Sequence, residues 1–203
     1  MPFTKAPVVM PVAQNIESPL IISFNSYFFF KSLIPISLAL EISLSYLSQI
    51  KSESKICFTG GNFGLSLLKK IEERKMNISM WSIFQTDERL ECSDNEIIQT
   101  KIIHHLKKCP GYDIEKNYFF PNSILGKKLT DFSETLRKLP FDKFDITFLS
   151  LGEDGHLAGH FSNSVFLEEN KFCYTENAPK LPKKRISFSL ENLMLSELIV
   201  LVS

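Results

Sequence analysis

The sequence has no excess of charge of either sign. Among its 203 residues, lysine and arginine total 23 and so do aspartate and glutamate, which gives a formal net charge of zero. A protein that binds nucleic acid usually carries a basic excess, so we expect no nucleic-acid partner. A local basic pocket for a small anion remains compatible with this balance, because net charge does not locate the charges.

Cysteine is scarce, and a secretory signal is lacking. The four cysteines lie far apart, at positions 57, 92, 109 and 173, and form no C-x-x-C pair. The first residues carry one early positive charge, Lys5, and no apolar segment that ends in small residues. Secreted proteins with disulfide frameworks show the opposite pattern. We therefore expect a reduced, cytoplasmic protein.

Long uncharged apolar runs are also missing. The segment 20–47 is rich in Phe, Ile and Leu, but Lys31, Pro35 and Glu41 interrupt it. A helix that spans a bilayer needs about 20 apolar residues in succession, so this segment is predicted to be core and no membrane partner is expected. No repeat or low-complexity linker divides the chain, which predicts a single domain over residues 1–203.

What the sequence does contain is an alternation of strands and helices. Strands are predicted at 56–59, 78–85, 144–151, 185–190 and 198–202, and helices at 36–50, 65–74, 95–107 and 129–139. Most of the strands are apolar without polar alternation, which is typical of an α/β fold with a mainly parallel sheet and helices on both faces. Ligands bind such sheets at the carboxyl ends of the strands. Three polar clusters follow predicted strands, so we expect a site at that edge.

The first cluster is the glycine turn TGGNFG at 59–64. Glycine lets the backbone turn sharply and bring its N–H groups to an anion, and the N-terminus of the following helix adds a favourable dipole. Phosphate is the anion that such a turn typically binds. The alternative is a tight connection between a strand and a helix that binds nothing.

The other two clusters supply charge and a proton acceptor. DER at 87–89 places an arginine, which suits phosphate or carboxylate oxygens, at a strand end; the alternative is a solvated surface. GEDGHLA at 152–158 contains His156, and a histidine side chain, with an ordinary pKa of about 6.5, can exchange a proton at neutral pH. A nearby carboxylate such as Asp154 can fix the histidine tautomer. The alternative for His156 is a solvated position in a loop.

Taken in order, these clusters resemble the 6-phosphogluconolactonase branch of the glucosamine-6-phosphate isomerase/deaminase-like superfamily. The family pattern runs S-G-G-S-T-P, D-E-R, G-x-G-x-D-G-H-T-A-S-L-F and R-I-T-L-T. The matching segments here are TGGNFG at 59–64, DER at 87–89, SLGEDGHLAGHF at 150–161 and RISFSL at 185–190. The resemblance runs from about residue 36 to the end of the chain.

The resemblance implies a Rossmann-like enzyme that hydrolyses 6-phospho-D-glucono-1,5-lactone to 6-phosphogluconate without metal or cofactor, as a monomer or homodimer. It implies that His156 is the general base and that Asp154 supports it. It also places a set of residues around the phosphorylated sugar lactone: Gly60, Gly61, Asn62, Asp87, Glu88, Arg89, Asn95, Gly155 and Arg185.

Several positions depart from the family pattern. NFG at 62–64 stands in place of Ser-Thr-Pro, Ser150 replaces a glycine, and GH at 159–160 replaces Ser-Leu. Family members continue after the strand at 198–202 with a glycine turn, a lysine of the site and a closing helix, whereas this chain stops at Ser203. A truncated C-terminus is therefore expected.

Three other functions stay open. An aminosugar-phosphate deaminase or isomerase of the same superfamily would place Glu-Pro soon after the histidine, and no carboxylate follows His156 closely here. A non-catalytic sugar-phosphate-binding relative agrees with the altered turn. A zinc hydrolase would use His156 and His160, four residues apart, but Gly155 and Gly159 disfavour the helix that such a pair needs.

Overall fold

The structure is a computed structural model that describes residues 35–50, 52–119, 143–162 and 172–202, and the backbone of 23–24, 27–30 and 167–169. Its larger sheet has seven strands in the order β1-β2-β11-β7-β3-β4-β6. Every neighbouring pair is parallel except β1 with β2. The strands are Ser23–Phe24 (β1), Tyr27–Phe30 (β2), Ser54–Phe58 (β3), Trp81–Gln85 (β4), Tyr118–Phe119 (β6), Ile146–Ser150 (β7) and Leu198–Val202 (β11).

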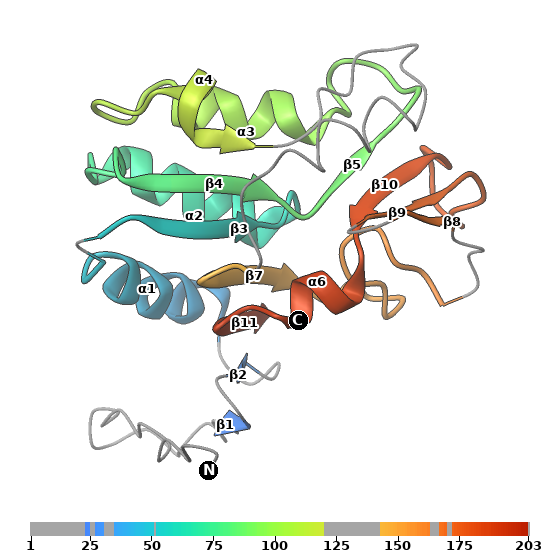
Figure 1. Cartoon of the computed structure of the whole chain (residues 1–203), viewed down its shortest axis with the longest axis horizontal. Helices are drawn as coiled ribbons and strands as arrows, with labels where there is room; N and C mark the ends of the chain where they lie inside the picture. The colour runs from blue at the N-terminus through green and yellow to red at the C-terminus, as the bar shows by residue number, and fades with distance from the viewer. Residues whose placement is uncertain are drawn as a thin grey trace.

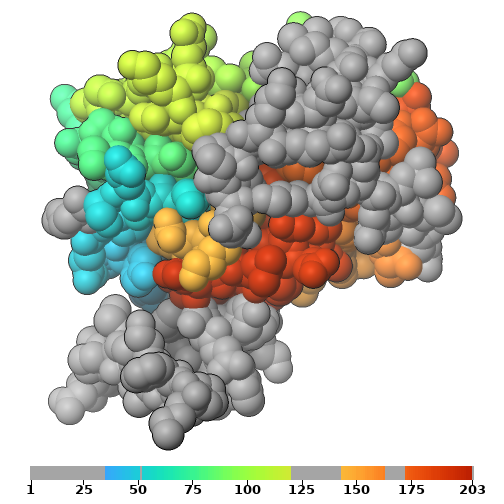
Figure 2. Space-filling view, in the orientation of Figure 1, coloured from blue at the N-terminus to red at the C-terminus, as the bar shows by residue number. Residues whose placement is uncertain are grey.

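A smaller, antiparallel sheet lies beside the carboxyl ends of these strands, at the right of Figure 1, in the order β5-β10-β9-β8. Its strands are Asp87–Arg89 (β5), Leu167–Glu169 (β8), Phe172–Thr175 (β9) and Arg185–Phe188 (β10). Only Thr86 separates β4 from β5, so the chain passes directly from one sheet to the other. In the space-filling view, the orange and red C-terminal segments lie against the blue and green ones (Figure 2).

Helices cover both faces of the larger sheet. On one face α2 contacts both α1 and α3, and its Phe63 packs on Phe148 of β7 with ring centroids 6.3 Å apart. Successive side chains of a strand point to opposite faces. The hydroxyl of Thr147 hydrogen bonds that of Ser196, just after α6, at 2.5 Å, so α6 ends on the other face. The helices are Ile36–Leu47 (α1), Asn62–Glu73 (α2), Ile98–Leu106 (α3), Ile114–Asn117 (α4) and Leu190–Met194 (α6).

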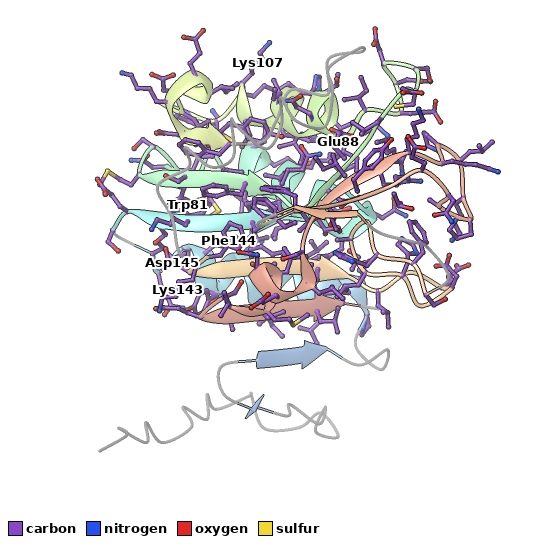
Figure 3. All side chains as sticks on the ribbon, turned by 45° about the vertical axis from the view of Figure 1, so that its right-hand side comes forward. Trp81, Glu88, Lys107, Lys143, Phe144 and Asp145 are labelled. Carbon is purple, nitrogen blue, oxygen red and sulfur yellow. The ribbon has the colours of Figure 1, made fainter. Side chains whose placement is uncertain are left out.

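A row of buried aromatic rings joins the two sheets. Phe144, labelled in Figure 3, lies edge-on to Phe84 of β4 and to Phe188 of β10, with both centroid distances 5.2 Å. Phe188 in turn packs on Phe172 of β9 at 4.3 Å. Burial of each large apolar side chain contributes about 1.5–3 kcal/mol. This row therefore fixes the position of the smaller sheet against the larger one.

The predicted α/β architecture, with a mainly parallel sheet covered on both faces, is confirmed. The predicted strands and helices that are present are β3, β4, β7, β10, β11, α1, α2 and α3. The antiparallel sheet was not predicted, because the pairing of β5 with β10 joins segments that lie far apart in the sequence. The predicted helix 129–139 lies outside the described residues. Among the described helices, none is long and apolar enough to cross a membrane.

Candidate active site

A pocket of about 350 Å³ opens at the carboxyl ends of β3, β4, β7 and β11. Residues of all three polar clusters line it, together with the start of β10 and the end of β11. The prediction that the clusters meet at this edge of the sheet is therefore confirmed. The charged or titratable residues in its lining are Asp87, Arg89, Glu153, His156 and Arg185.

The glycine turn forms one wall of the pocket. Gly60, Gly61, Asn62 and Phe63 all line it, and Gly61 is the N-cap of α2, which no side chain caps. A Cβ on Gly60 would lie 2.1 Å from Cγ2 of Ile98, so glycine is what lets this turn approach α3 closely. The first turn of α2 holds no acidic residue. This end of the helix therefore offers backbone donors and the positive end of the dipole to an anion.

His156 lies in the loop after β7 and faces the pocket. Its Nδ1 donates a hydrogen bond to Oδ1 of Asp154, and Oδ2 of Asp154 lies 3.1 Å from Nζ of Lys180. The hydrogen bond from His156, assisted by Lys180, lowers the pKa of Asp154 well below its ordinary range. An ionised Asp154 holds the proton of the imidazole on Nδ1. Nε2 of His156 is then the nitrogen with a lone pair for a proton.

Two neighbours hold the imidazole in place. The loop closes through hydrogen bonds from Gly152 N to His156 O, at 2.8 Å, and from Gly155 N to Gly152 O, at 2.9 Å. A Cβ on Gly152 would lie 2.1 Å from both Cε1 and Nδ1 of His156, so the ring fills space that only glycine leaves free. Phe161 stacks on the ring, with centroids 4.8 Å apart and planes 20° apart. The ring is thus oriented by the protein itself.

The pairing of β5 with β10 brings two arginines together. Arg89 lies opposite Arg185 in the register of the two strands. Arg185 is 6% exposed, and its guanidinium donates from Nε to Pro182 O at 2.7 Å and from Nη2 to Leu181 O at 3.2 Å. Burial lowers the pKa of Arg185, yet an arginine stays charged at neutral pH. Both cations line the pocket and make it attractive to an anion.

Asp87 is the buried carboxyl of the pocket. Burial raises its pKa, although a hydrogen bond from the Thr86 hydroxyl, 2.7 Å long, and the positive charges of Arg185 and Arg89 act in the opposite direction. A carboxyl with a raised pKa is poised to accept or release a proton closer to neutral pH. Asp87 therefore adds a buried titratable carboxyl to the pocket that His156 faces.

Glu88, in contrast to Asp87, binds the start of α3 and not the pocket. It is fully buried, does not line the pocket, and lies inside the fold in Figure 3. The side chain of Ile97, the N-cap residue of α3, makes no capping hydrogen bond. The carboxylate of Glu88, in β5, accepts hydrogen bonds from the first backbone N–H groups of this helix instead. Burial raises the pKa of Glu88, while its hydrogen bonds lower it. The groups that donate to its carboxylate are Gln85 Nε2 (2.9 Å), Arg89 N (2.7 Å), Ile98 N (2.8 Å) and Gln99 N (2.7 Å).

Two further predicted site residues lie outside the pocket lining. Asn95 is exposed and accepts a hydrogen bond from the Ser93 hydroxyl at 2.5 Å. Gly155 is exposed with φ of +79°, so it shapes the loop that carries His156. The structure brings together the predicted residues Gly60, Gly61, Asn62, Asp87, Arg89, His156 and Arg185, with Asp154 behind His156.

His160 does not join His156 in a metal site. Its Nε2 lies 2.9 Å from Phe188 O and 3.3 Å from Cys173 Sγ. Among the residues that the structure describes, no three His, Cys, Asp or Glu side chains gather as ligands for a metal ion. The four-residue spacing on which the zinc alternative rested therefore does not produce a pair of facing imidazoles.

Sequence reasoning missed three side chains of this region. Phe161 contacts His156 and also lies 5.7 Å from the guanidinium carbon of Arg185. Lys180 reaches Asp154 from the loop between β9 and β10. Ser150 was noted as a departure from the family pattern but was given no role, although it lines the pocket. Phe161 matches the last residue of a family motif, whereas nothing local marks Lys180.

The arrangement combines a proton acceptor with a site for an anion. His156 is oriented by Asp154 and faces a pocket that also holds two arginines and the N-terminus of α2. Such a base can activate a water molecule, and the positive groups can hold a phosphate or stabilise a developing oxyanion.

Known proteins are similar to this chain in sequence. The family model described as Glucosamine-6-phosphate isomerases/6-phosphogluconolactonase matches residues 37–203. The chain is 27% identical over 190 residues to "Probable 6-phosphogluconolactonase 2" of Oryza sativa subsp. indica, which covers 82% of this chain and 68% of that relative. It is 39% identical over 64 residues to the 6-phosphogluconolactonase of Borreliella burgdorferi, which covers 30% of this chain and 27% of that one.

Solved structures share the fold. The 6-phosphogluconolactonase from Plasmodium vivax superposes with a TM-score of 0.69 at 18% identity, over 87% of this chain and 75% of that one. A monomeric glucosamine-6-phosphate deaminase superposes with a TM-score of 0.62 at 14% identity, over 87% of this chain and 80% of that one. The same fold thus occurs in a lactonase and in a deaminase, so the choice between these activities depends on the site.

Proposed function

The chain belongs to the glucosamine-6-phosphate isomerase/6-phosphogluconolactonase family, and from that premise we propose that it hydrolyses 6-phospho-D-glucono-1,5-lactone to 6-phosphogluconate, a step of the pentose phosphate pathway. It is then a carboxylic ester hydrolase whose partner is a phosphorylated sugar lactone. The observation that carries the proposal is the hydrogen-bonded pair of Asp154 and His156 at a pocket with two arginines. None of the four cysteines forms a disulfide, which supports a reduced, cytoplasmic setting.

In this mechanism His156 is the general base. Nε2 takes a proton from a water molecule, and the oxygen of that water attacks the lactone carbonyl carbon. Asp154, ionised and bonded to Nδ1, stabilises the imidazolium that forms. When the tetrahedral intermediate collapses, the bond between the carbonyl carbon and the ring oxygen breaks. The imidazolium returns its proton to that oxygen, which becomes a hydroxyl of the product.

The positive groups of the pocket hold the anionic parts of the substrate. The N-terminus of α2 receives the phosphate through the backbone of Gly61 and Asn62. Arg89 and Arg185 supply positive charge to the phosphate and to the developing oxyanion. Asp87 contacts a sugar hydroxyl from the floor of the pocket. The binding of the phosphate at a fixed point brings the lactone carbonyl to His156.

Hydrolysis of freshly prepared 6-phosphogluconolactone tests the proposal, with the spontaneous rate subtracted. We expect the wild-type chain to be active and His156→Ala to lose about 10²- to 10⁴-fold in kcat/KM. His104→Ala is the matched control, because His104 is exposed and contacts Lys108 on the surface, with 2.9 Å between Nε2 and Nζ. Equal rates in wild type and His156→Ala would refute the role of His156.

The deaminase alternative needs a separate assay. The segment after His156 is LAGHFS, which offers no carboxylate for proton transfer at the C1–C2 bond of an aminosugar. We therefore expect no release of ammonia from glucosamine 6-phosphate. Rapid release of ammonia, with little hydrolysis of the lactone, would replace the lactonase by the deaminase.

A further inference from the structure

Three buried side-chain atoms among the described residues have no hydrogen-bond partner there. They are Oγ of Ser43, Nε of Arg89 and Oγ of Ser150. Arg89 and Ser150 both line the pocket, whereas Ser43 lies in α1, outside the lining. Native proteins seldom leave buried polar groups unpaired. Two such groups at one pocket therefore indicate a polar ligand that completes their hydrogen bonding.

Ser150 stands where the glycine turn meets the loop of His156. It is the last residue of β7 and pairs with Val202 of β11. Its Oγ lies 3.4 Å from the point that a Cβ on Gly61 would occupy, and Gly61 is the N-cap of α2. Because side chains alternate along a strand, Ser150 shares a face with Phe148, which packs on Phe63 of the same helix. The hydroxyl is thus adjacent to the uncapped N-terminus of α2.

We propose that Ser150 is a phosphate-binding residue whose hydroxyl donates a hydrogen bond to an anion held at the start of α2. This inference rests on the proposed function, because it assigns a further contact to the phosphate of the same substrate. The contact requires Oγ, which lies beside Gly61, to rotate about χ1 to a staggered position that faces the pocket. The phosphate then receives a charge-assisted hydrogen bond from Ser150 and satisfies an atom that has no partner among the described residues.

Titration with inorganic phosphate tests this contact without any enzymatic turnover. Isothermal calorimetry on the wild-type chain, Ser150→Ala and Ser43→Ala should give a dissociation constant about tenfold higher for Ser150→Ala than for the other two. Ser43→Ala is the control, since it removes the other unpaired buried hydroxyl away from the pocket. Neither variant should have a lower Tm, because each removes a hydroxyl that lacks a partner among the described residues. Equal phosphate affinities for wild type and Ser150→Ala, or no binding by either, would overturn the proposal.

Kinetics separate this proposal from the proposed function. For the phosphorylated lactone, Ser150→Ala should raise KM about tenfold with kcat unchanged. For glucono-1,5-lactone, which has no phosphate, both parameters should stay as in wild type. A Ser150→Ala variant whose kcat/KM falls by the same factor for both lactones would overturn the phosphate contact. A wild-type chain that hydrolyses neither lactone would refute the lactonase, while the phosphate titration would still decide the role of Ser150.

Discussion

Asp154 and Glu88 both stand in motifs of the family, yet the fold uses the two carboxylates in opposite ways. Asp154 lies in an exposed loop, where His156 and Lys180 lower its pKa. Glu88 lies in the interior, where burial raises its pKa. The partners of Asp154 are the side chains of His156, which lines the pocket, and of Lys180. Those of Glu88 are mostly backbone N–H groups, including two at the start of α3.

The comparison shows that the position of a carboxylate in the fold, more than the motif that contains it, determines its role. Asp87 and Glu88 are neighbours in a strand, so their side chains point to opposite sides. Asp87 reaches the pocket, and Glu88 reaches α3. Within the DER motif, Asp87 thus lines the pocket, and Glu88 holds the start of α3. Substitutions at Glu88 and at Asp154 should therefore show their effects in different assays, the first in stability and the second in catalysis.

The largest expected effect is on stability, at Glu88. Glu88→Ala should lower the free energy of unfolding by about 3–5 kcal/mol, because the donors that it satisfies are left buried and unpaired. Urea unfolding followed by circular dichroism measures this loss. Glu73→Ala, which removes an exposed carboxylate paired with Lys70 at 3.1 Å, should change stability by less than about 1 kcal/mol. Similar losses in the two variants would contradict the capping role of Glu88.

The corresponding substitution at Asp154 should affect catalysis instead. Asp154→Asn removes the charge that stabilises the imidazolium, so we expect kcat to fall about 100-fold. The free energy of unfolding should fall by less than in Glu88→Ala, because Asp154 lies in an exposed loop. A steady-state lactonase assay and a urea titration on the same preparation give both quantities. A large loss of stability with kcat intact would reverse the distinction between the two carboxylates.

The parts of this molecule that the sequence predicts are those determined by short-range patterns. The turn at 59–64 and the loop at 152–158 each follow an apolar strand, so their meeting at one sheet edge could be expected before the structure was known. The role of Glu88 could not, because Ile98 and Gln99 approach it through tertiary packing. The same holds for Lys180, which reaches Asp154 from the loop between β9 and β10. Pairings of this kind depend on the whole fold and leave no local pattern.

A smaller effect is expected at the glycine that makes room for the imidazole. The new methyl group of Gly152→Ala would lie 2.1 Å from His156, so the ring must move and kcat should fall about tenfold. Gly155→Ala is the contrasting variant, because its Cβ would meet nothing within 4 Å but its φ of +79° suits glycine. It should cost about 1 kcal/mol of stability with a smaller loss of kcat than Gly152→Ala. Steady-state kinetics and thermal unfolding of both variants test the pair, and equal losses of kcat would contradict it.

The smallest effect is a difference in the pH dependence of stability between the two carboxylates. The pKa of Asp154 is lowered in the folded state, so its contribution is complete above its ordinary pKa near ~3.9 and is lost as the pH falls through the folded value. The pKa of Glu88 is raised, so the folded state loses stability as the pH rises from near ~4.3 through the folded value. Urea unfolding of wild type, Asp154→Asn and Glu88→Gln over this acid range measures both trends. The advantage of wild type over Asp154→Asn should shrink towards low pH, whereas its advantage over Glu88→Gln should shrink towards higher pH. If both stability differences changed with pH in the same direction, the two carboxylates would lie in the same kind of environment. That result would contradict the contacts described for them.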